Sequence, residues 1–103
     1  MKSMKIRFTP EAAKLLTKFH PTNKKLIKAA LKDLRKDPNL GDELQEELSG
    51  FRSHKVKRYR IVYNVNESED AIEVYYVGHR RDVYEQFRIL LDKLQAKSQI
   101  NDS

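Results

Sequence analysis

The residues that could carry chemistry are concentrated in two short segments of the chain. The first, residues 51–60, reads FRSHKVKRYR and contains no acidic residue. The second, residues 78–85, reads GHRRDVYE. Guanidinium groups present a planar fork of hydrogen-bond donors that matches phosphate oxygens, and they stay charged at any physiological pH. The two segments therefore predict a site that handles a phosphate-bearing polyanion.

The second segment adds groups that suit phosphate chemistry at an expected helix start. Arg80, Arg81 and Tyr84 lie where free backbone N–H groups and the helix dipole attract anions. Tyr84 could donate a hydrogen bond to a phosphate oxygen or stack on a base, or it could be a core residue. His79 could act as a general acid or base near neutral pH, or it could be an ordinary polar surface residue.

The charge distribution supports an anionic partner. The chain has 103 residues, a net charge of +6 and an isoelectric point near 9.6, which favours nucleic acid or an acidic protein as partner. Eight of the 15 acids lie in a connector at residues 39–50 and a turn at residues 66–73. Because like charges on paired strands destabilise a sheet, residues 51–60 predict that an anion normally lies over them. The lysines of an expected helix at residues 24–36 are, by contrast, typical of a solvated face.

Several classes of protein are excluded by what the sequence lacks. It has no cysteine, which excludes disulfide scaffolds, thiolate metal sites and thiol nucleophiles. No apolar run approaches the roughly 18 residues of a membrane span, and no signal-peptide pattern opens the chain. The sequence shows no zinc-ligand spacing, phosphate loop or nucleophile–base motif. We therefore expect a cytoplasmic protein without a membrane association, a metal or another cofactor.

A small α+β domain must position the two segments. Apolar alternation predicts the strands, with Lys57-Arg58 as a hairpin turn, and helical periodicity predicts the helices. The expected fold is a small antiparallel sheet with an N-terminal helical hairpin and a C-terminal helix, in one domain over residues 1–95 followed by a polar, disordered tail at residues 96–103. The predicted elements are a strand at 5–9, a helix from Pro10, a helix at 24–36, a strand pair around 51–65, a strand at 72–77 and a helix after Asp82.

The sequence resembles the RelE/ParE superfamily of toxins from type II toxin–antitoxin modules. The resemblance covers residues 5–94 and rests on LSGFRSHKVKRYRIVY at residues 48–63 and VGHRRDVYE at residues 77–85. It implies a RelE-like fold and a ribosome-dependent endonuclease that cuts mRNA in the A site without a metal. In that reaction the 2′-hydroxyl of the substrate attacks the adjacent phosphate and leaves a 2′,3′-cyclic phosphate and a 5′-hydroxyl end.

The resemblance also implies roles for individual residues. Arg60 matches an arginine that contacts the reacting phosphate, Arg80 matches one that stabilises the developing charge, and Tyr84 matches a tyrosine that orients the substrate. Lys55 is the candidate base and His79 an alternative proton carrier, and which group is base and which is acid stays open. The other cations of the two segments are expected to bind RNA: Arg52, His54, Lys57, Arg58 and Arg81.

Partners and alternative functions follow from the same resemblance. It implies an acidic antitoxin encoded by a neighbouring gene, with mRNA and the ribosome as further partners. The free toxin is expected to be a monomer and its complex with antitoxin a larger assembly. Two alternatives remain: a ParE-like inhibitor of DNA gyrase, which keeps the fold without the nuclease residues, and a basic RNA-binding module without catalysis. Arg60, Arg80 and Tyr84 together favour the nuclease.

Overall fold

The computed structural model describes the backbone of residues 3–101 and the side chains of residues 3–94. Its elements, in chain order, are β1 (Lys5–Phe8), α1 (Pro10–Thr17), α2 (Pro21–Lys36), β2 (Asp42–Glu43), the 3₁₀ helix η1 (Glu46–Leu48), β3 (Arg52–Val56), β4 (Tyr59–Asn66), the 3₁₀ helix η2 (Glu67–Glu69), β5 (Ala71–His79) and α3 (Val83–Asn101). The predicted polar, disordered tail at residues 96–103 lies beyond the residues whose side chains are described, and it stays a prediction.

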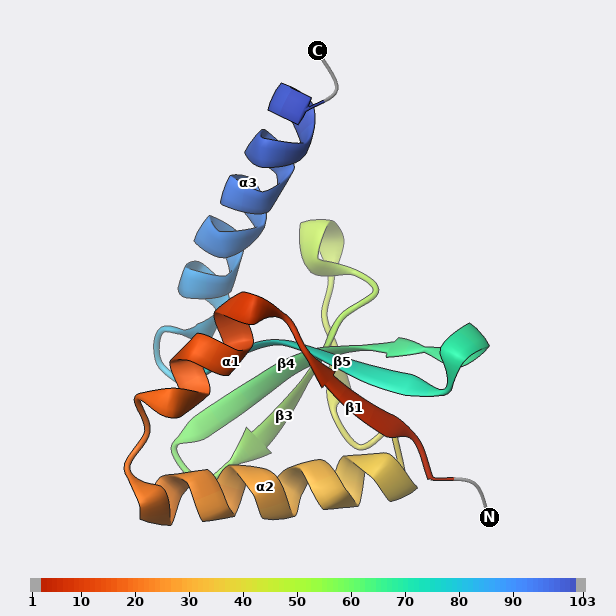
Figure 1. Cartoon of the computed structure of the whole chain (residues 1–103), viewed down its shortest axis with the longest axis vertical. Coiled ribbons are helices and arrows are strands. Elements are labelled where there is room, and N and C mark those ends of the chain that lie inside the picture. Colours follow the sequence, from red (N-terminus) through yellow and green to blue (C-terminus); the bar gives the residue numbers. More distant parts are fainter. Residues whose placement is uncertain (1–2, 102–103) are drawn as a thin grey trace.

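The strands form one sheet in the order β1-β5-β4-β3-β2 (Figure 1). The predicted α+β class and the antiparallel pairing are confirmed for β2 through β5. β1 departs from the prediction because it pairs parallel with β5, which requires the chain to cross over through the intervening elements. The sequence also failed to predict β2, which pairs Asp42 with Ser53 and Glu43 with Arg52 at the opposite edge.

Proline and a capping side chain set the start of both N-terminal helices. Thr9 Oγ1 accepts a hydrogen bond from Ala12 N at 3.1 Å, and Pro10 occupies the first helical turn, as predicted. His20 and Pro21 repeat the arrangement for α2, with His20 Nδ1 accepting from the backbone N–H of Thr22 at 3.3 Å. The second helix therefore begins three residues earlier than the predicted residue 24.

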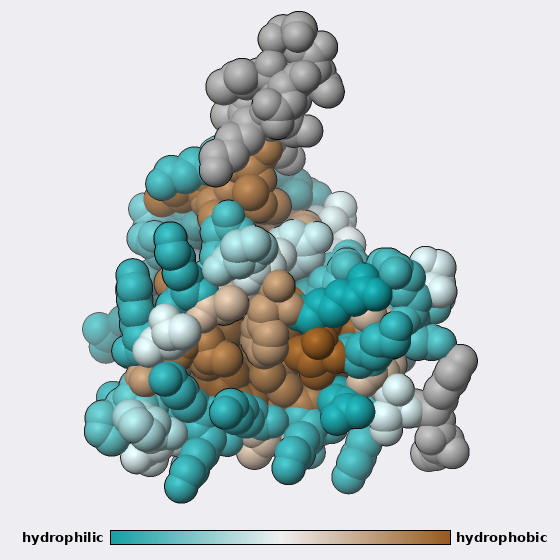
Figure 2. All heavy atoms as spheres, in the orientation of Figure 1, coloured by the Kyte–Doolittle hydropathy of each residue, from teal (hydrophilic) through white to brown (hydrophobic). Residues whose placement is uncertain are grey.

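The larger part of the core lies between the sheet and the two N-terminal helices. The helix α2 lies along one side of the sheet (Figure 1). Its apolar periodicity gives it a stripe of buried side chains that belongs to the same cluster as those of the strands. Figure 2 shows apolar side chains between α1 and α2, with hydrophilic residues around them. The buried members of this cluster are Ala12, Ile27, Ala30, Leu31, Leu34, Ile61, Tyr63, Ile72, Val74 and Val77.

The helix α3 covers the other face of the sheet. Its Val83 and Phe87 are fully buried and cluster with Leu48 of η1 and Val62 of β4. Ile61 and Val62 are neighbours in sequence and belong to opposite clusters, as alternation along a strand requires. Because the N-terminal helices cover one face of the sheet and α3 covers the other, each apolar or aromatic side chain of β4 packs into one of the two clusters or the other.

Tyr63 ties the connector before β2 to the sheet. Its hydroxyl donates to the carbonyl of Pro38 at 2.6 Å and accepts from Gly41 N at 3.0 Å. Burial raises the pKa of this phenol. A Cβ at position 41 would lie 2.7 Å from the Tyr63 oxygen, so the close approach requires glycine there.

We predict that Tyr63→Phe destabilises the protein by about 1–3 kcal/mol, because it leaves a buried N–H and a carbonyl without their partner. Urea denaturation monitored by circular dichroism measures the change. The control is Tyr75→Phe, which removes a phenol oxygen that makes no hydrogen bond within the described part of the chain. Equal losses in the two variants would contradict the role assigned to the Tyr63 hydroxyl.

Candidate functional site

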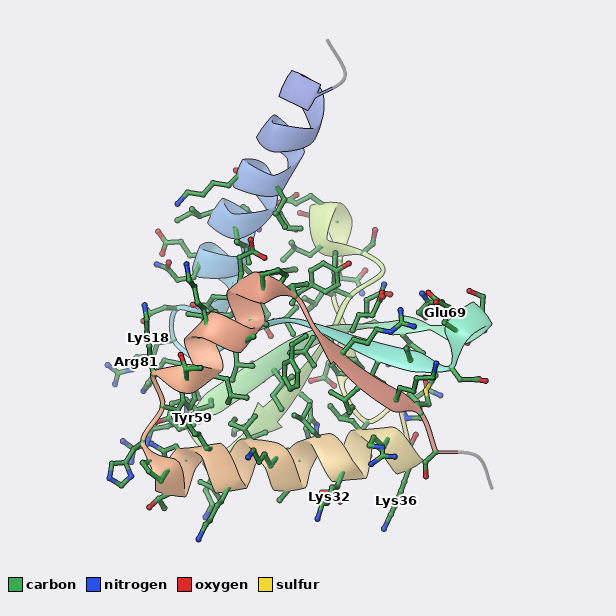
Figure 3. The ribbon with its side chains drawn as sticks, viewed as in Figure 1. Lys18, Lys32, Lys36, Tyr59, Glu69 and Arg81 are labelled. Carbon is green, nitrogen blue, oxygen red and sulfur yellow. The ribbon has the colours of Figure 1, made fainter. Side chains whose placement is uncertain are left out.

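Basic and acidic groups lie at opposite ends of the central strand pair. In the pairing of β4 with β5, Tyr59 lies opposite His79 at one end and Asn66 lies opposite Ala71 at the other. The first end carries the Lys57-Arg58 turn, and the second carries the acidic turn η2. Figure 3 shows Tyr59 and Arg81 at one end of the sheet and Glu69 at the other. The charge separation seen along the sequence is therefore also a separation in space.

The two chemistry-bearing segments meet at the basic end, as the sequence predicted. Arg60 lies directly opposite Gly78 across β4 and β5. The backbone N–H of Arg80 donates to the carbonyl of Arg58 at 2.8 Å, which extends the strand pairing past the end of β5. Arg60 and Arg80 thus lie two rungs apart on the same strand pair, with the rung of Tyr59 and His79 between them.

A pocket of about 560 Å³ opens at this end of the sheet. We call it the hairpin-end pocket. It lies beside the start of α3, whose first turn begins at Val83. All of its lining residues are basic: Lys57, Arg58, His79, Arg80 and Arg81. A concave surface of this kind, next to a helix N-terminus, is suited to phosphate oxygens.

A second group of side chains lies next to Arg60 on the face covered by α3. The Arg60 guanidinium carbon lies 5.9 Å from the centroid of the Tyr84 ring, within the range of a cation–π contact. Arg60 Nη1 donates to Ser53 Oγ at 3.2 Å, and the Tyr84 hydroxyl donates to the same oxygen at 3.4 Å. We call these three residues the Ser53 cluster. The structure therefore brings Arg60 and Tyr84 together but places Arg80 in the adjoining pocket.

Lys55 and Asp42 border the Ser53 cluster. Lys55 lies opposite Arg60 across β3 and β4, so both side chains leave the same face of the sheet. The Asp42 carboxylate lies 3.9 Å from Arg60 Nη1 and is 84% exposed. The like charges of Lys55 and Arg60 repel each other, and Asp42 is the counterion nearest to Arg60.

His79 and Tyr59 line the basic end from the other face. They lie opposite each other, and their rings meet edge to face with centroids 5.9 Å apart. The Tyr59 hydroxyl accepts from Asn23 Nδ2 at 3.0 Å, which attaches the start of α2 to this end of the sheet. His79 is exposed and reaches the hairpin-end pocket, whereas Lys55 is on the Arg60 face.

Two of the predicted RNA-binding residues do not line the hairpin-end pocket. Arg52 donates to the carbonyl of Gly41 at 2.8 Å and pairs with Glu43 at 3.1 Å. His54 lies opposite Ile61, on the face covered by α2. Burial there lowers the pKa of His54. The Asp33 carboxylate opposes this shift, and the charge of Arg60 adds to it. A neutral, partly buried imidazole on that face is a weak candidate for phosphate binding.

Sequence reasoning missed two members of this site, Ser53 and Asp42. Ser53 falls between basic residues, and only the strand alternation distinguishes its face from that of its neighbours. Asp42 was grouped with the acidic connector because nothing in the sequence indicates the strand β2. Within residues 3–94, no group of three or more histidine, aspartate or glutamate side chains could hold a metal ion. None of the described helices is long and apolar enough to cross a bilayer.

Comparisons with known proteins agree with this architecture. The family described as the ParE toxin of the type II toxin–antitoxin system parDE matches residues 6–84. Toxin RelG of Mycobacterium tuberculosis is 31% identical over 81 residues, which cover 77% of this chain and 93% of that protein.

Solved structures show the same fold. A toxin–antitoxin complex of Mycobacterium tuberculosis, RelBE2, contains a chain that matches with a TM-score of 0.71 and 29% identity, covering 78% of this chain and 94% of that one. The intact RelBE toxin–antitoxin complex of E. coli matches with a TM-score of 0.67 and 22% identity, covering 75% and 96%.

The lowered pKa of His54 makes a testable prediction about acid stability. Because the fold lowers the pKa of His54, the folded state binds a proton less readily than the unfolded state does. This difference costs no stability above the unfolded pKa of about 6.5, but the free energy of unfolding falls as the pH drops below that value. We expect His54→Gln to lose less thermal stability than the wild type between pH 7 and pH 5. Melting at pH 8, where the imidazole is neutral in both states, gives the packing cost of the substitution. An equal decrease in melting temperature between pH 7 and pH 5 for the two proteins would contradict the prediction.

Proposed function

This chain belongs to the RelE/ParE superfamily of type II toxins, and from that membership we propose that it is a ribosome-dependent mRNA endonuclease. The observation that carries the proposal is the meeting of Arg60, Tyr84 and Arg80 at one basic end of the sheet, beside a pocket lined by basic residues. Such an end can bind the RNA backbone and also stabilise charge on one reacting phosphate.

The proposed reaction uses the substrate's own 2′-hydroxyl as nucleophile. This oxygen forms a bond to the adjacent phosphorus as the bond from phosphorus to the 5′ oxygen breaks, which yields a 2′,3′-cyclic phosphate. Lys55, which shares a face with Arg60, is the candidate for accepting the 2′-hydroxyl proton, and His79 of the hairpin-end pocket is the alternative proton carrier. The leaving 5′ oxygen takes its proton from another cation of the basic end or from water. Negative charge grows on the phosphate oxygens during this step, and Arg60 and Arg80 are placed to stabilise it.

The remaining groups of the basic end position the substrate. Lys57, Arg58 and Arg81 line the hairpin-end pocket and are placed to bind flanking phosphates. Tyr84 is 37% exposed, so its ring can stack on a base while its hydroxyl stays on Ser53. Binding that rests on so many cations should weaken steeply as salt rises.

We propose an antitoxin, mRNA and the ribosome as partners. The RelBE2 and RelBE structures that match this chain are complexes of a toxin with its antitoxin. An acidic antitoxin would cover the basic end and neutralise its charge. Because mRNA and ribosomes are its proposed targets, we place the protein in the cytoplasm, as a monomer when free and in a larger assembly with its antitoxin.

One observation favours a second candidate, inhibition of DNA gyrase. The family that matches residues 6–84 is described as the ParE toxin. The resemblance to the superfamily implies inhibition of gyrase for its ParE-like members. The placement of Arg60 beside Tyr84 is a reason to prefer the nuclease, since inhibition of gyrase by protein contact does not need a phosphate-stabilising pair.

Cleavage of ribosome-bound mRNA by Arg80→Ala tests the proposed function. We expect the wild type to cut within codons and leave 2′,3′-cyclic phosphate ends, and the variant to cut at least about tenfold more slowly, because one stabilising donor is lost. The control is Arg7→Ala, which removes an arginine that pairs with Glu69 at the acidic end of the sheet. Equal cleavage rates for the wild type and Arg80→Ala would show that Arg80 does not contribute to catalysis.

The same preparation separates the alternatives. Inhibition of supercoiling by gyrase without cleavage of mRNA would establish the ParE-like activity instead. Salt-sensitive RNA binding without cyclic phosphate ends would establish a non-catalytic module.

Asp42→Asn should increase RNA affinity, because it frees Arg60 from its nearest carboxylate. The pair is exposed and its Nη1–Oδ2 distance is 3.9 Å, so we expect only about two- to threefold tighter binding. Fluorescence anisotropy at low salt with a 2′-O-methyl RNA oligonucleotide, which lacks the nucleophile, measures binding without cleavage. Glu47→Gln is the control, because it changes the net charge by the same amount but removes a carboxylate that pairs with Arg88 and not with Arg60. Equal gains in the two variants would show an effect of net charge alone.

A further inference from the structure

Ser53 is a polar residue in an apolar position. It is 1% exposed, and apart from the Tyr63 hydroxyl it carries the only polar side-chain group among the buried residues described. It lies in β3, opposite Val62 of β4 on one side and Asp42 of β2 on the other. Val62 belongs to the core cluster beneath α3, so Ser53 borders that cluster. An alanine would fill this position without burying a hydroxyl.

The Ser53 oxygen joins two residues that come from different elements. It accepts from Arg60 Nη1 of β4 at 3.2 Å and from the hydroxyl of Tyr84, in the first turn of α3, at 3.4 Å. Arg60 is 7 residues and Tyr84 is 31 residues from Ser53 along the chain. No buried side-chain nitrogen or oxygen in the described part lacks a partner, so the hydroxyl is satisfied by this arrangement.

We propose that Ser53 is a positioning residue, whose buried hydroxyl holds Arg60 and Tyr84 in the geometry needed for phosphoryl chemistry before RNA binds. The proposal rests on the proposed nuclease function. Ser53 does not itself reach the substrate, because its side chain is buried beneath the two residues that it holds.

The exposure of the two partners argues against a purely structural role. The Arg60 side chain is 21% exposed and Tyr84 is 37% exposed, so water can replace the serine hydroxyl for both. Removing the hydroxyl therefore leaves no buried group unsatisfied, and stability should change little. What the hydroxyl adds is a fixed position for two flexible side chains.

Ser53 also determines which partner Arg60 keeps. The serine oxygen lies 3.2 Å from Arg60 Nη1, and the Asp42 carboxylate lies 3.9 Å from the same atom. Without the hydroxyl, the guanidinium can rotate toward the carboxylate, which would turn its donors away from the pocket side. An arginine that must leave a carboxylate before it meets a phosphate stabilises the transition state less well.

The experiment compares Ser53→Ala, Ser53→Thr and Ser53→Val with the wild type in the mRNA cleavage assay. Thr and Val have nearly the same shape, so their difference reports on the hydroxyl alone. We expect Ser53→Ala to lower kcat about tenfold with KM within about twofold, because the lost geometry matters in the transition state. Ser53→Thr should cleave faster than Ser53→Val, and the melting temperature of Ser53→Ala should stay within about 5 °C of the wild type.

A second measurement on the free protein separates failure of this proposal from failure of the nuclease function. Side-chain NMR relaxation of Arg60 Nε and the Tyr84 ring should show lower order in Ser53→Ala than in the wild type. If the wild type does not cleave mRNA, the nuclease function fails, and an ordered Arg60 and Tyr84 in Ser53→Ala would also overturn the positioning role. If the wild type cleaves, an unchanged kcat in Ser53→Ala, or equal rates for the Thr and Val variants, overturns the positioning role alone.

Discussion

The pairing register of β4 with β5 is the constraint on which the rest of the structure depends. It places Arg60 opposite Gly78 and Tyr59 opposite His79, and thereby brings two segments from either side of an acidic turn to one end of the sheet. A slip by one residue would move every side chain of β4 to the other face. Such a slip would put Ile61 and Tyr63 on the α3 side and Arg60 beneath the N-terminal helices. Because both faces are covered by apolar layers, the core itself fixes the register that assembles the site.

Gly78 shows how closely the core and the site are joined. A Cβ at this position would lie 2.5 Å from the ring of Tyr76, a contact that no real side chain makes without displacement. Tyr76 packs against the core cluster beneath α3, and its ring lies over the strand beside the rung that carries Arg60. Burial raises the pKa of this phenol, and the charge of Asp82 raises it further. The glycine therefore lets an aromatic ring of the core extend to the strand rung that carries Arg60.

The parts that the sequence predicted are those with a local signal. The strands followed from alternation and the helix starts from Thr9-Pro10, and the meeting of the two basic segments followed because consecutive strands usually pair. β2 consists of two acidic residues, which have low strand propensity. Its pairing depends on partners in β3 about ten residues away, so no local pattern in the sequence reveals it. Arg52 and His54 were grouped with Lys55 by charge, although alternation puts them on the other face. Ser53 could have been recognised by the same alternation, but its buried contact with Tyr84 needs the position of α3, which no local pattern contains.

The short strand β2 links the charge of the site to the stability of the fold. Its two carboxylates lie against Arg52 and Arg60, so residues that look like part of an acidic connector act as counterions within the protein. These pairs partly offset the repulsion among the cations of the hairpin, which would otherwise weaken the pairing of β3 with β4. Under the proposed function, an anionic partner at the basic end would replace the Asp42 carboxylate as the counterion of Arg60. Binding would then be coupled to the attachment of this edge strand, because any partner that binds only the folded chain also stabilises it. In the proposed function, the same cations that repel one another in the free fold would bind the RNA backbone or an acidic antitoxin.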